Sequence, residues 1–284
     1  MNRIIACVDG SIYTPSVCGY AAWAAQQLEL PVEILHVVQR QYEAISYADF
    51  NAGMGLGAQD RFLQELTALD EQRNQVLAQR GSALVLDAEE QIRSHGIYNI
   101  SSRCRHGSLV DALHELEDRT SLIVIGKRGE AADFDRLHLG SSVERVVRAL
   151  RSPVLVASRT YKPIERVLVA YDGAASSRKA VEEVCSNPLY KGLERHVVMV
   201  ANASPSAEGH LVWARERLIA AGGPYTLERL IGEPEAVMAE YVKTHEIHLL
   251  VMGAYGHSRI RQLIVGSTTT QMIRTCLIPI LLYR

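Results

Sequence analysis

The sequence predicts an α/β fold of two tandem domains, each a five-stranded parallel sheet with helices on both faces. Three observations support this prediction: the chain repeats itself, its apolar runs are short and near-continuous, and amphipathic segments separate those runs. The repeat opens with RIIACVDGS (3–11), which is answered by RVLVAYDGA (166–174). In both copies the next apolar run ends at the same distance from the aspartate.

The expected strands are runs of mostly β-branched or apolar residues that do not alternate with polar ones. This pattern is typical of strands buried on both faces. Three further pairs match between the copies: VEILHVV (32–38) with RHVVMVA (195–201), SLIVIGKRG (121–129) with HLLVMGAYG (248–256), and SPVLVAS (152–158) with IPILLYR (278–284). Five strands that alternate with four helices, twice, indicate a parallel sheet covered on both faces.

The expected helices include the amphipathic segments 14–29, 108–118 and 234–245, which carry Ser or Pro at their starts. Proline is tolerated in the first turn of a helix, and serine is a preferred capping residue there. These segments therefore read as the helices that connect the parallel strands.

The polar segment RTYKPIE (159–165) is predicted to link a first domain, residues 1–158, to a second domain, residues 166–284. The copies differ mainly between their second and third strands. Residues 39–99 hold a glycine-bearing loop and a long charged helical stretch, whereas 202–224 leaves room for one short helix. We interpret the insertion as surface elaboration of the first domain, with a regulatory or dimerisation element as the alternative.

Composition restricts the function classes. Hydrophobic residues make up 48% of the chain and charged residues 22%, with a net charge of −2, so no global basic field favours nucleic acid. The five cysteines contain no CxxC pair and fall mostly in apolar runs, which favours buried reduced thiols in a cytosolic protein. The start of the chain does not resemble a signal peptide, and no apolar stretch approaches the roughly 20 residues of a membrane span. We expect a cytoplasmic protein.

Glycines and hydroxyl residues gather where the expected fourth strand of the second copy ends. Gly253 and Gly256 allow unusual backbone angles and close approach of a ligand to main-chain N–H groups. Gly266 and Ser267 then begin an expected helix, whose first N–H groups have no internal partner and attract anions such as phosphate. The segment therefore resembles a phosphate cradle; the alternative is a turn, a loop and a capped helix without a ligand.

At this point the residues match a known family. The series Gly253-x-x-Gly256, nine residues, then Gly266-Ser267 resembles the nucleotide-binding signature of the universal stress protein family. The strand-Asp-Gly openings and the proline before each final strand also fit, and the resemblance covers nearly the whole chain as two tandem domains. It implies an adenine-nucleotide α-hydrolase-like, Rossmann-like fold that binds ATP, with Mg²⁺ as an optional companion, and a role in surviving stress.

The resemblance also implies roles for particular residues. Asp172 would contact the adenosine, and Ala201 would line the adenine pocket with its backbone. Met252 and Gly253 would flank the ribose and the first phosphate. The residues implied to hold the phosphates are Gly256, Gly266, Ser267, Thr268 and Thr269.

The first copy departs from the family pattern. Ten residues instead of nine separate Gly129 from Gly140, and they include Glu130, Asp133 and Asp135. Three carboxylates beside a triphosphate would oppose its binding unless a cation intervenes or they point away. We therefore expect the second copy to be the better nucleotide site and leave the first open. The candidate residues of the first site are Asp9, Gly126, Gly129, Gly140, Ser141 and Ser142.

The sequence gives little support for catalysis or a metal centre. It contains no Walker A loop, no G-x-S-x-G elbow and no H-E-x-x-H zinc motif. The segment HEIH (245–248) straddles a helix end and a strand start, where His245 favours the helix C-terminus. We assign no catalytic residue and no metal ligand.

The leading hypothesis is a tandem ATP-binding protein with a regulatory or protective role in the stress response, not a turnover enzyme. The alternatives are a slow ATPase or phosphotransferase, and a protein-interaction module that does not depend on nucleotide. The resemblance further implies that strands 153–158 and 278–284 pair to form an internal pseudo-dimer, and a homodimer is possible. No nucleic-acid or membrane partner is expected.

Overall fold

The computed structural model describes residues 2–38, 56–129, 141–254, 272 and 276–284. Its first half contains β1 (Arg3–Val8), α1 (Thr14–Leu28), β2 (Val32–Val38), α3 (Leu56–Ser94), β3 (Ile100–His106), α4 (Leu109–Leu116), η1 (Glu117–Arg119), β4 (Thr120–Gly126), α5 (Ser141–Ala149) and β5 (Val154–Ala157). Its second half contains β6 (Arg166–Ala170), α6 (Ala175–Ser186), η3 (Pro188–Tyr190), β7 (Glu194–Val200), α7 (Pro205–Ala221), β8 (Tyr225–Leu230), α8 (Pro234–Thr244), β9 (Leu249–Gly253) and β10 (Ile280–Tyr283).

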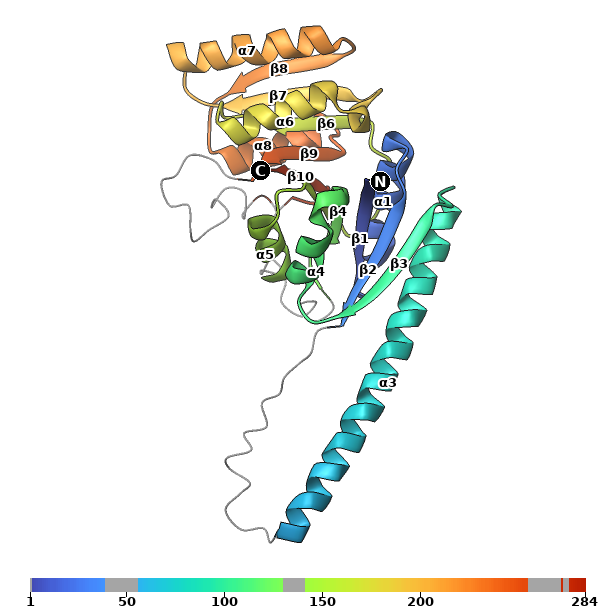
Figure 1. Ribbon diagram of the computed structural model, residues 1–284. Coiled ribbons are helices and arrows are strands. Elements are labelled where there is room, and N and C mark those ends of the chain that lie inside the picture. Colours follow the sequence, from blue (N-terminus) through green and yellow to red (C-terminus); the bar gives the residue numbers. More distant parts are fainter. Residues whose placement is uncertain (1, 39–55, 130–140, 255–271, 273–275) are drawn as a thin grey trace.

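The strands form one ten-stranded sheet in the order β3-β2-β1-β4-β5-β10-β9-β6-β7-β8 (Figure 1). Within each half every strand pairs in parallel with its neighbours, which confirms the predicted α/β class with two parallel five-stranded units. Each half places its first strand at the centre and sends the chain outward in both directions from it. This is the doubly wound arrangement of open α/β sheets.

The two halves join through β5 and β10, which pair antiparallel with Ile280 opposite Val156 and Leu281 opposite Leu155. The predicted pairing of the final strands across the repeats is therefore confirmed. Leu155 and Leu281 are fully buried, so the junction lies inside the continuous sheet rather than at a surface contact between two domains. Each half would otherwise expose this strand as an unpaired edge.

Apolar side chains are buried on both faces of the sheet. One core contains side chains of α1, α6, α7 and the C-terminal part of α3, whereas the other contains those of α4, α5 and α8. Successive residues of β1 alternate between the two cores: Ile4 packs in the first and Ile5 in the second. This explains why the strands show near-continuous apolar runs.

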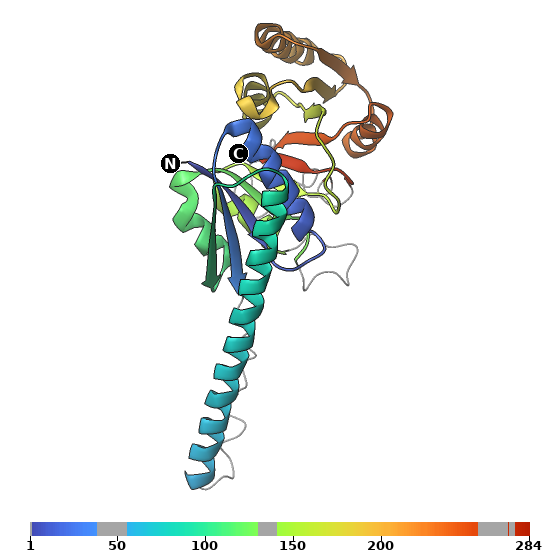
Figure 2. The same ribbon diagram turned by 90° about the vertical axis from the view of Figure 1, so that its right-hand side faces the viewer.

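The first half differs from the second by the 39-residue helix α3, which extends well beyond the sheet (Figures 1 and 2). Its C-terminal turns bury Val85, Ala88 and Ile92 in the same core as α1. The insertion is therefore not only surface elaboration, since its last turns take the position that α7 has in the second half. The second half has one helix in the corresponding segment, as predicted, and this helix, α7, spans 17 residues.

Two other local predictions need correction. Ser108 stands at the N-cap of α4, but its side chain makes no capping hydrogen bond. Proline does occupy the first turn of α1 and α8, as predicted. Cys7 and Cys18 are buried free thiols, whereas Cys104 on the edge strand β3 is exposed.

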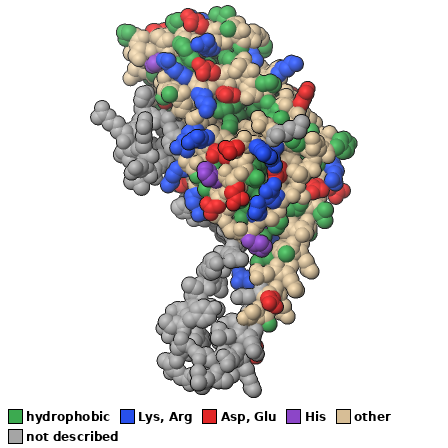
Figure 3. Space-filling model, viewed as in Figure 1, with side chains coloured by type: hydrophobic (Ala, Val, Ile, Leu, Met, Phe, Trp, Pro, Cys, Tyr) green, Lys and Arg blue, Asp and Glu red, His purple; other side chains and the backbone are tan. Residues whose placement is uncertain are grey.

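The surface fits the balanced composition. On the face in Figure 3, Lys and Arg side chains are interspersed with Asp and Glu, and no large described area carries one sign of charge. Among the described residues, no helix is long and apolar enough to cross a membrane.

A buried tyrosine pair near the junction provides a test of the packing. The hydroxyls of Tyr190 in η3 and Tyr283 in β10 lie 2.9 Å apart, and both residues are at most 2% exposed. We expect Tyr283→Phe to lower the free energy of unfolding by about 1–3 kcal/mol, because it leaves the Tyr190 hydroxyl buried without its partner. The double variant Tyr190→Phe/Tyr283→Phe should lose less than the sum of the two single variants.

Urea unfolding followed by circular dichroism measures this double-mutant cycle. Tyr225→Phe is the matched control because Tyr225 is 38% exposed, and it should change stability little. Strictly additive losses in the double variant would show that the two hydroxyls do not support one another.

Candidate functional site

The candidate site of the second half lies where β6, β7 and β9 end. Ala170 of β6 stands opposite Val198 of β7 and Met252 of β9, so the three strands end at one edge of the sheet. Asp172 follows β6, and Gly253 closes β9. On either side of β6 the chain winds in opposite directions, so the carboxyl end of this strand lies at the topological switch point of the sheet. Open α/β sheets bind ligands at this point.

Asp172 is held in a tight turn before α6. Its Oδ1 accepts hydrogen bonds from the N–H of Ala174 at 2.9 Å and from the hydroxyl of Ser177 at 2.5 Å. Gly173 adopts φ +80°, a left-handed conformation that favours glycine. With Oδ1 engaged in the turn, Oδ2 is the carboxylate oxygen that can accept a hydrogen bond from a ligand.

Gly253 brings the end of β9 against the first turn of α6. A Cβ atom at this position would lie 2.4 Å from the hydroxyl oxygen of Ser176 and 2.7 Å from its Cβ. Any larger residue would push the strand end away from the helix. The first glycine of the predicted motif is therefore required for packing. The sequence predicts a different reason for this glycine, namely close approach of a ligand to the main chain.

The two remaining described candidates of this half are Met252 and Ala201. Met252 is buried at the end of β9. Ala201 directly follows β7, and its N–H donates to the carbonyl of Leu230 at 3.0 Å. Its carbonyl accepts from Arg229 at 3.4 Å. The main-chain N–H of Ala201 is thus already used inside the protein, although the residue stands at the predicted edge.

The phosphate-binding part of the prediction falls outside the described residues. This applies to Gly256, Gly266, Ser267, Thr268 and Thr269 of the second half, and to Gly140 of the first. Ser141 and Ser142 do begin helix α5, so the first half has a helix N-terminus at the predicted place.

In the first half the structure brings Asp9 and Gly129 together. A Cβ atom on Gly129 would lie 3.0 Å from Oδ2 of Asp9, whose Oδ1 accepts from the N–H of Ser11 at 3.1 Å. Gly126, at the end of β4, packs closely against Tyr13: a Cβ atom on this glycine would lie 2.7 Å from the Cβ of Tyr13. The equivalent turns of the two halves therefore share their geometry at the strand ends.

Lys127, which follows β4, contacts the other half of the molecule. Its Nζ donates to the carbonyl of Cys276 at 3.1 Å, and burial lowers the pKa of its ammonium group to about 8. This lysine therefore links the strand end of the first half to the segment before β10.

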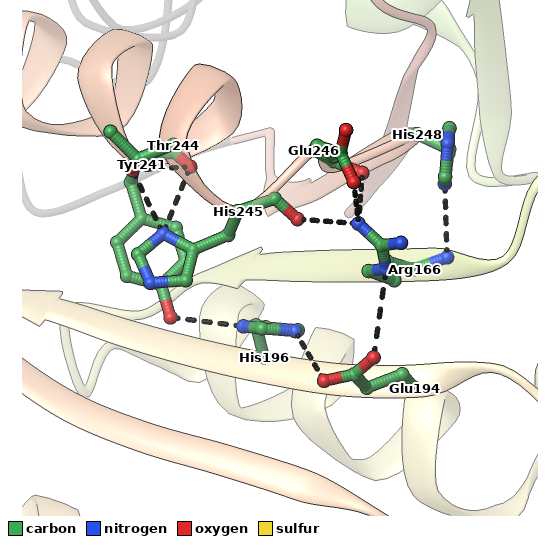
Figure 4. A network of polar contacts seen from close by, with 8 residues as sticks. All are labelled: Arg166, Glu194, His196, Tyr241, Thr244, His245, Glu246 and His248. Atoms are coloured by element: carbon green, nitrogen blue, oxygen red, sulfur yellow. Dashed lines mark hydrogen bonds and ion pairs between the residues drawn. The ribbon is translucent and has the colours of Figure 1, made fainter.

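A polar network occupies the opposite edge of the sheet, where β6, β7 and β9 begin (Figure 4). Arg166 lies at its centre and donates to the carboxylate of Glu246 at 2.9 Å, with Glu194 at 3.6 Å on its other side. His245 stands at the C-cap of α8, as predicted, and its ring stacks on Tyr241 at 3.8 Å. Among the described residues no group of His, Cys, Asp and Glu could hold a metal ion.

His196 is the buried member of this network, with 3% of its surface exposed. Its Nδ1 lies 2.9 Å from the hydroxyl of Tyr241, and its Nε2 lies 3.1 Å from Oε1 of Glu194. Burial lowers the pKa of His196, and the nearby carboxylate of Glu194 opposes this shift without reversing it. The imidazole of His196 therefore links β7 to α8 at the amino-end edge of the sheet.

Known proteins resemble this chain over most of its length. A family model described as "Universal stress protein family" matches residues 1–158 and 190–284. The curated protein "Universal stress protein Slr1230" of Synechocystis sp. is 34% identical over 287 aligned residues and is covered completely, as is this chain. A second curated group, represented by "Universal stress protein Rv1996" of Mycobacterium tuberculosis, is 27% identical over 67% of this chain and 60% of that protein.

Solved structures share the fold over the whole chain. A universal stress protein from Archaeoglobus fulgidus superposes with a TM-score of 0.73 at 20% identity, covering 100% of this chain and 96% of that one. A Pseudomonas aeruginosa structure described as a putative universal stress protein gives a TM-score of 0.63 at 16% identity, covering 100% and 93%. At these identities the likeness concerns the fold alone.

The lowered pKa of His196 predicts how stability depends on pH. In the folded protein this ring binds a proton less readily than it does in the unfolded chain. Histidines of an unfolded chain titrate at about pH 6.5. The stability contributed by neutral His196 is therefore fully present above about pH 6.5 and is lost as the pH falls through the folded-state value. His196→Gln, which cannot titrate, should lose less stability than the wild type over this interval.

Chemical denaturation at a series of pH values measures this difference. His114→Gln is the matched control, because the side chain of His114 is 73% exposed, and its curve should run parallel to that of the wild type. If the curve of His196→Gln also runs parallel, burial of this imidazole does not control the acid sensitivity.

Proposed function

Because this chain belongs to the universal stress protein family, we propose that its second half binds ATP and that the protein serves a regulatory or protective role in the stress response. The single observation that supports ATP most strongly is the series Gly253-x-x-Gly256, nine residues, Gly266-Ser267. It begins at the carboxyl end of β9, beside the strand that leads to Asp172.

The described geometry is compatible with a nucleoside at this edge. Oδ2 of Asp172 can accept from a ribose hydroxyl or a base N–H group, because Oδ1 is engaged by Ala174 and Ser177. The tight contact of Gly253 with Ser176 brings the start of the glycine motif close to α6. A phosphate chain would continue from there toward the hydroxyl-rich end of the motif, where the sequence predicts a helix start whose main-chain N–H groups would bind it.

Mg²⁺ is a plausible companion of a bound triphosphate, since it commonly bridges phosphate oxygens and needs few protein ligands. No described residue is assigned to it. The proposal therefore concerns ATP, with Mg²⁺ as a variable of the experiment.

We further propose that the protein binds ATP without rapid turnover. The turn at Asp172 uses one carboxylate oxygen to hold itself, so this residue is suited to positioning a ligand rather than to transferring a proton. A slow ATPase or phosphotransferase remains the competing activity, and an interaction module independent of nucleotide is the competing role.

Isothermal titration with ATP, in the presence and absence of Mg²⁺, tests binding. The protein is first denatured and analysed by mass spectrometry to detect nucleotide that has co-purified. Gly266→Glu should weaken binding by at least about tenfold, because a carboxylate at the motif repels the phosphates. Gly140→Glu is the matched variant at the corresponding glycine of the first half and should leave the stronger site unchanged.

Absence of binding heat in nucleotide-free wild-type protein would remove the ATP proposal. Equal losses in the two glycine variants would contradict the assignment of the stronger site to the second half.

A phosphate-release assay separates binding from hydrolysis. We expect release no faster than the uncatalysed background in saturating MgATP. Phosphate release well above background that disappears in a folded Asp172→Ala variant would contradict this expectation. The protein would then be a slow hydrolase. Circular dichroism tests whether the variant is folded.

A further inference from the structure

Gly173, the residue after Asp172, is clamped between two helices. A Cβ atom on this glycine would lie 2.5 Å from Cδ2 of His210, so the imidazole of α7 rests directly on the turn. From α6, Nε of Arg178 donates to the carbonyl of Gly173 at 3.1 Å. The peptide beside the candidate ligand-binding carboxylate is thus held by one contact from each helix.

The two clamping side chains also bind one another. Nη2 of Arg178 lies 3.0 Å from Nδ1 of His210. A guanidinium can only donate hydrogen bonds, so Nδ1 must be the acceptor and carry no proton. The ring is then neutral with its proton on Nε2, which lies 3.4 Å from the hydroxyl of Ser206. The contact therefore requires an uncharged His210.

Aromatic side chains support the pair. The ring of Trp213 on α7 lies 5.1 Å from the guanidinium carbon of Arg178, and it stacks on Tyr171 at 5.9 Å. The hydroxyl of Tyr171 donates to the carbonyl of His210 at 3.4 Å. Because Trp213 touches Arg178 and Tyr171 together, its environment changes if the pair separates.

The first half lacks this arrangement. The equivalent glycine, Gly10, has φ +74° and is covered by Leu84 of α3, with a virtual Cβ distance of 3.2 Å. Pro15 stands six residues after Asp9, where Arg178 stands six residues after Asp172. An apolar side chain and a proline cannot form a charged hydrogen-bonded pair. At these described positions the first half therefore has no counterpart of the Arg178–His210 pair.

We propose that Arg178 and His210 form a latch that positions the Asp172–Gly173 turn for nucleotide, and that protonation of His210 opens it. This inference rests on the proposed function, because it assumes that the turn contacts ATP. Arg178 and His210 are positioning residues: they act on the ligand through the peptide that they hold.

The charges around His210 define the direction of the effect. Protonation removes the acceptor at Nδ1 and places an imidazolium against the guanidinium of Arg178, and like charges at this distance repel. Arg217, 5.6 Å from the Trp213 ring, adds positive charge on the α7 side. Asp172 at the turn is the neighbouring carboxylate, and Tyr171 contributes a neutral hydroxyl. Acid should therefore weaken the latch and, with it, nucleotide binding.

The first experiment compares ATP binding by the full-length wild type, His210→Gln and His210→Leu between about pH 8 and about pH 5, where histidines change charge. All three are made in a Gly140→Glu background, so that binding in the second half alone is measured, and the wild type of this comparison is that background with His210 unchanged. Glutamine offers Arg178 an amide oxygen that cannot be protonated in this range, whereas leucine removes the acceptor. His114→Gln, on the exposed surface of α4, is the matched control.

We expect the wild type to lose about tenfold more affinity on acidification than His210→Gln. His210→Leu should bind about tenfold more weakly than His210→Gln at both ends of the range. The protonation of ATP is common to all proteins and cancels in the comparison. Circular dichroism at each pH tests whether every variant is folded. If His210→Leu does not fold, the comparison of the wild type with His210→Gln still decides the test.

A second readout does not need ATP. In a Trp23→Phe background, Trp213 is the remaining tryptophan of the chain. Its fluorescence should change on acidification in the parent protein and stay constant in the His210→Gln variant. A constant signal in both proteins would overturn the latch, whatever the binding data show.

The outcomes separate the two proposals. If the wild type binds ATP and all profiles run parallel, the latch is wrong and ATP binding stands. If nucleotide-free wild type binds no ATP at about pH 8, the proposed function fails, and the latch fails as a nucleotide-positioning device even where Trp213 responds to acid.

Discussion

The antiparallel pairing of β5 with β10 is the contact on which the rest of the molecule depends. Each half ends in a strand whose outer side would be an exposed edge, and the two strands cover one another along Val154–Val156 and Ile280–Leu282. The pairing merges two five-stranded units into one sheet with shared cores on both faces. It also relates the halves by an approximate two-fold axis, which gives each its own strand-end site. The tandem chain therefore contains within itself an interface of the kind that separate subunits would form.

The two edges of the second half have different roles because they differ in what their polar groups bind. At the amino ends, Arg166, Glu194 and His196 bind other protein side chains, so that edge is a closed structural network. At the carboxyl ends, Oδ1 of Asp172 is engaged within its own turn, and the turn is held from outside by α6 and α7. A site that must present an acceptor in one orientation needs such external support, since a glycine-containing turn is intrinsically permissive.

The two halves share their strand-end glycines but differ in the side chains that cover the aspartate turn. Both keep a left-handed glycine after the aspartate and a close-packed glycine at the end of the fourth strand. They differ in what covers the turn: Leu84 of the long helix α3 in the first half, and His210 with Arg178 in the second. This difference agrees with the altered glycine spacing of the first motif. Both differences support the proposal that nucleotide binds in the second half. Lys127 connects the first half to the segment before β10.

The sequence by itself determined the repeat, the parallel strand order and the position of Asp172 and Gly253 at strand ends, because apolar periodicity and strand-Asp-Gly turns are local patterns. It also suggested the pairing of the final strands, through the family resemblance. Only the tertiary structure decided that the C-terminal turns of α3 belong to the core and that Arg178 meets His210. Arg178 and His210 lie 32 positions apart on two helices, and neither belongs to a motif. Contacts between distant helices depend on how the helices pack on the sheet, and no local spacing encodes them.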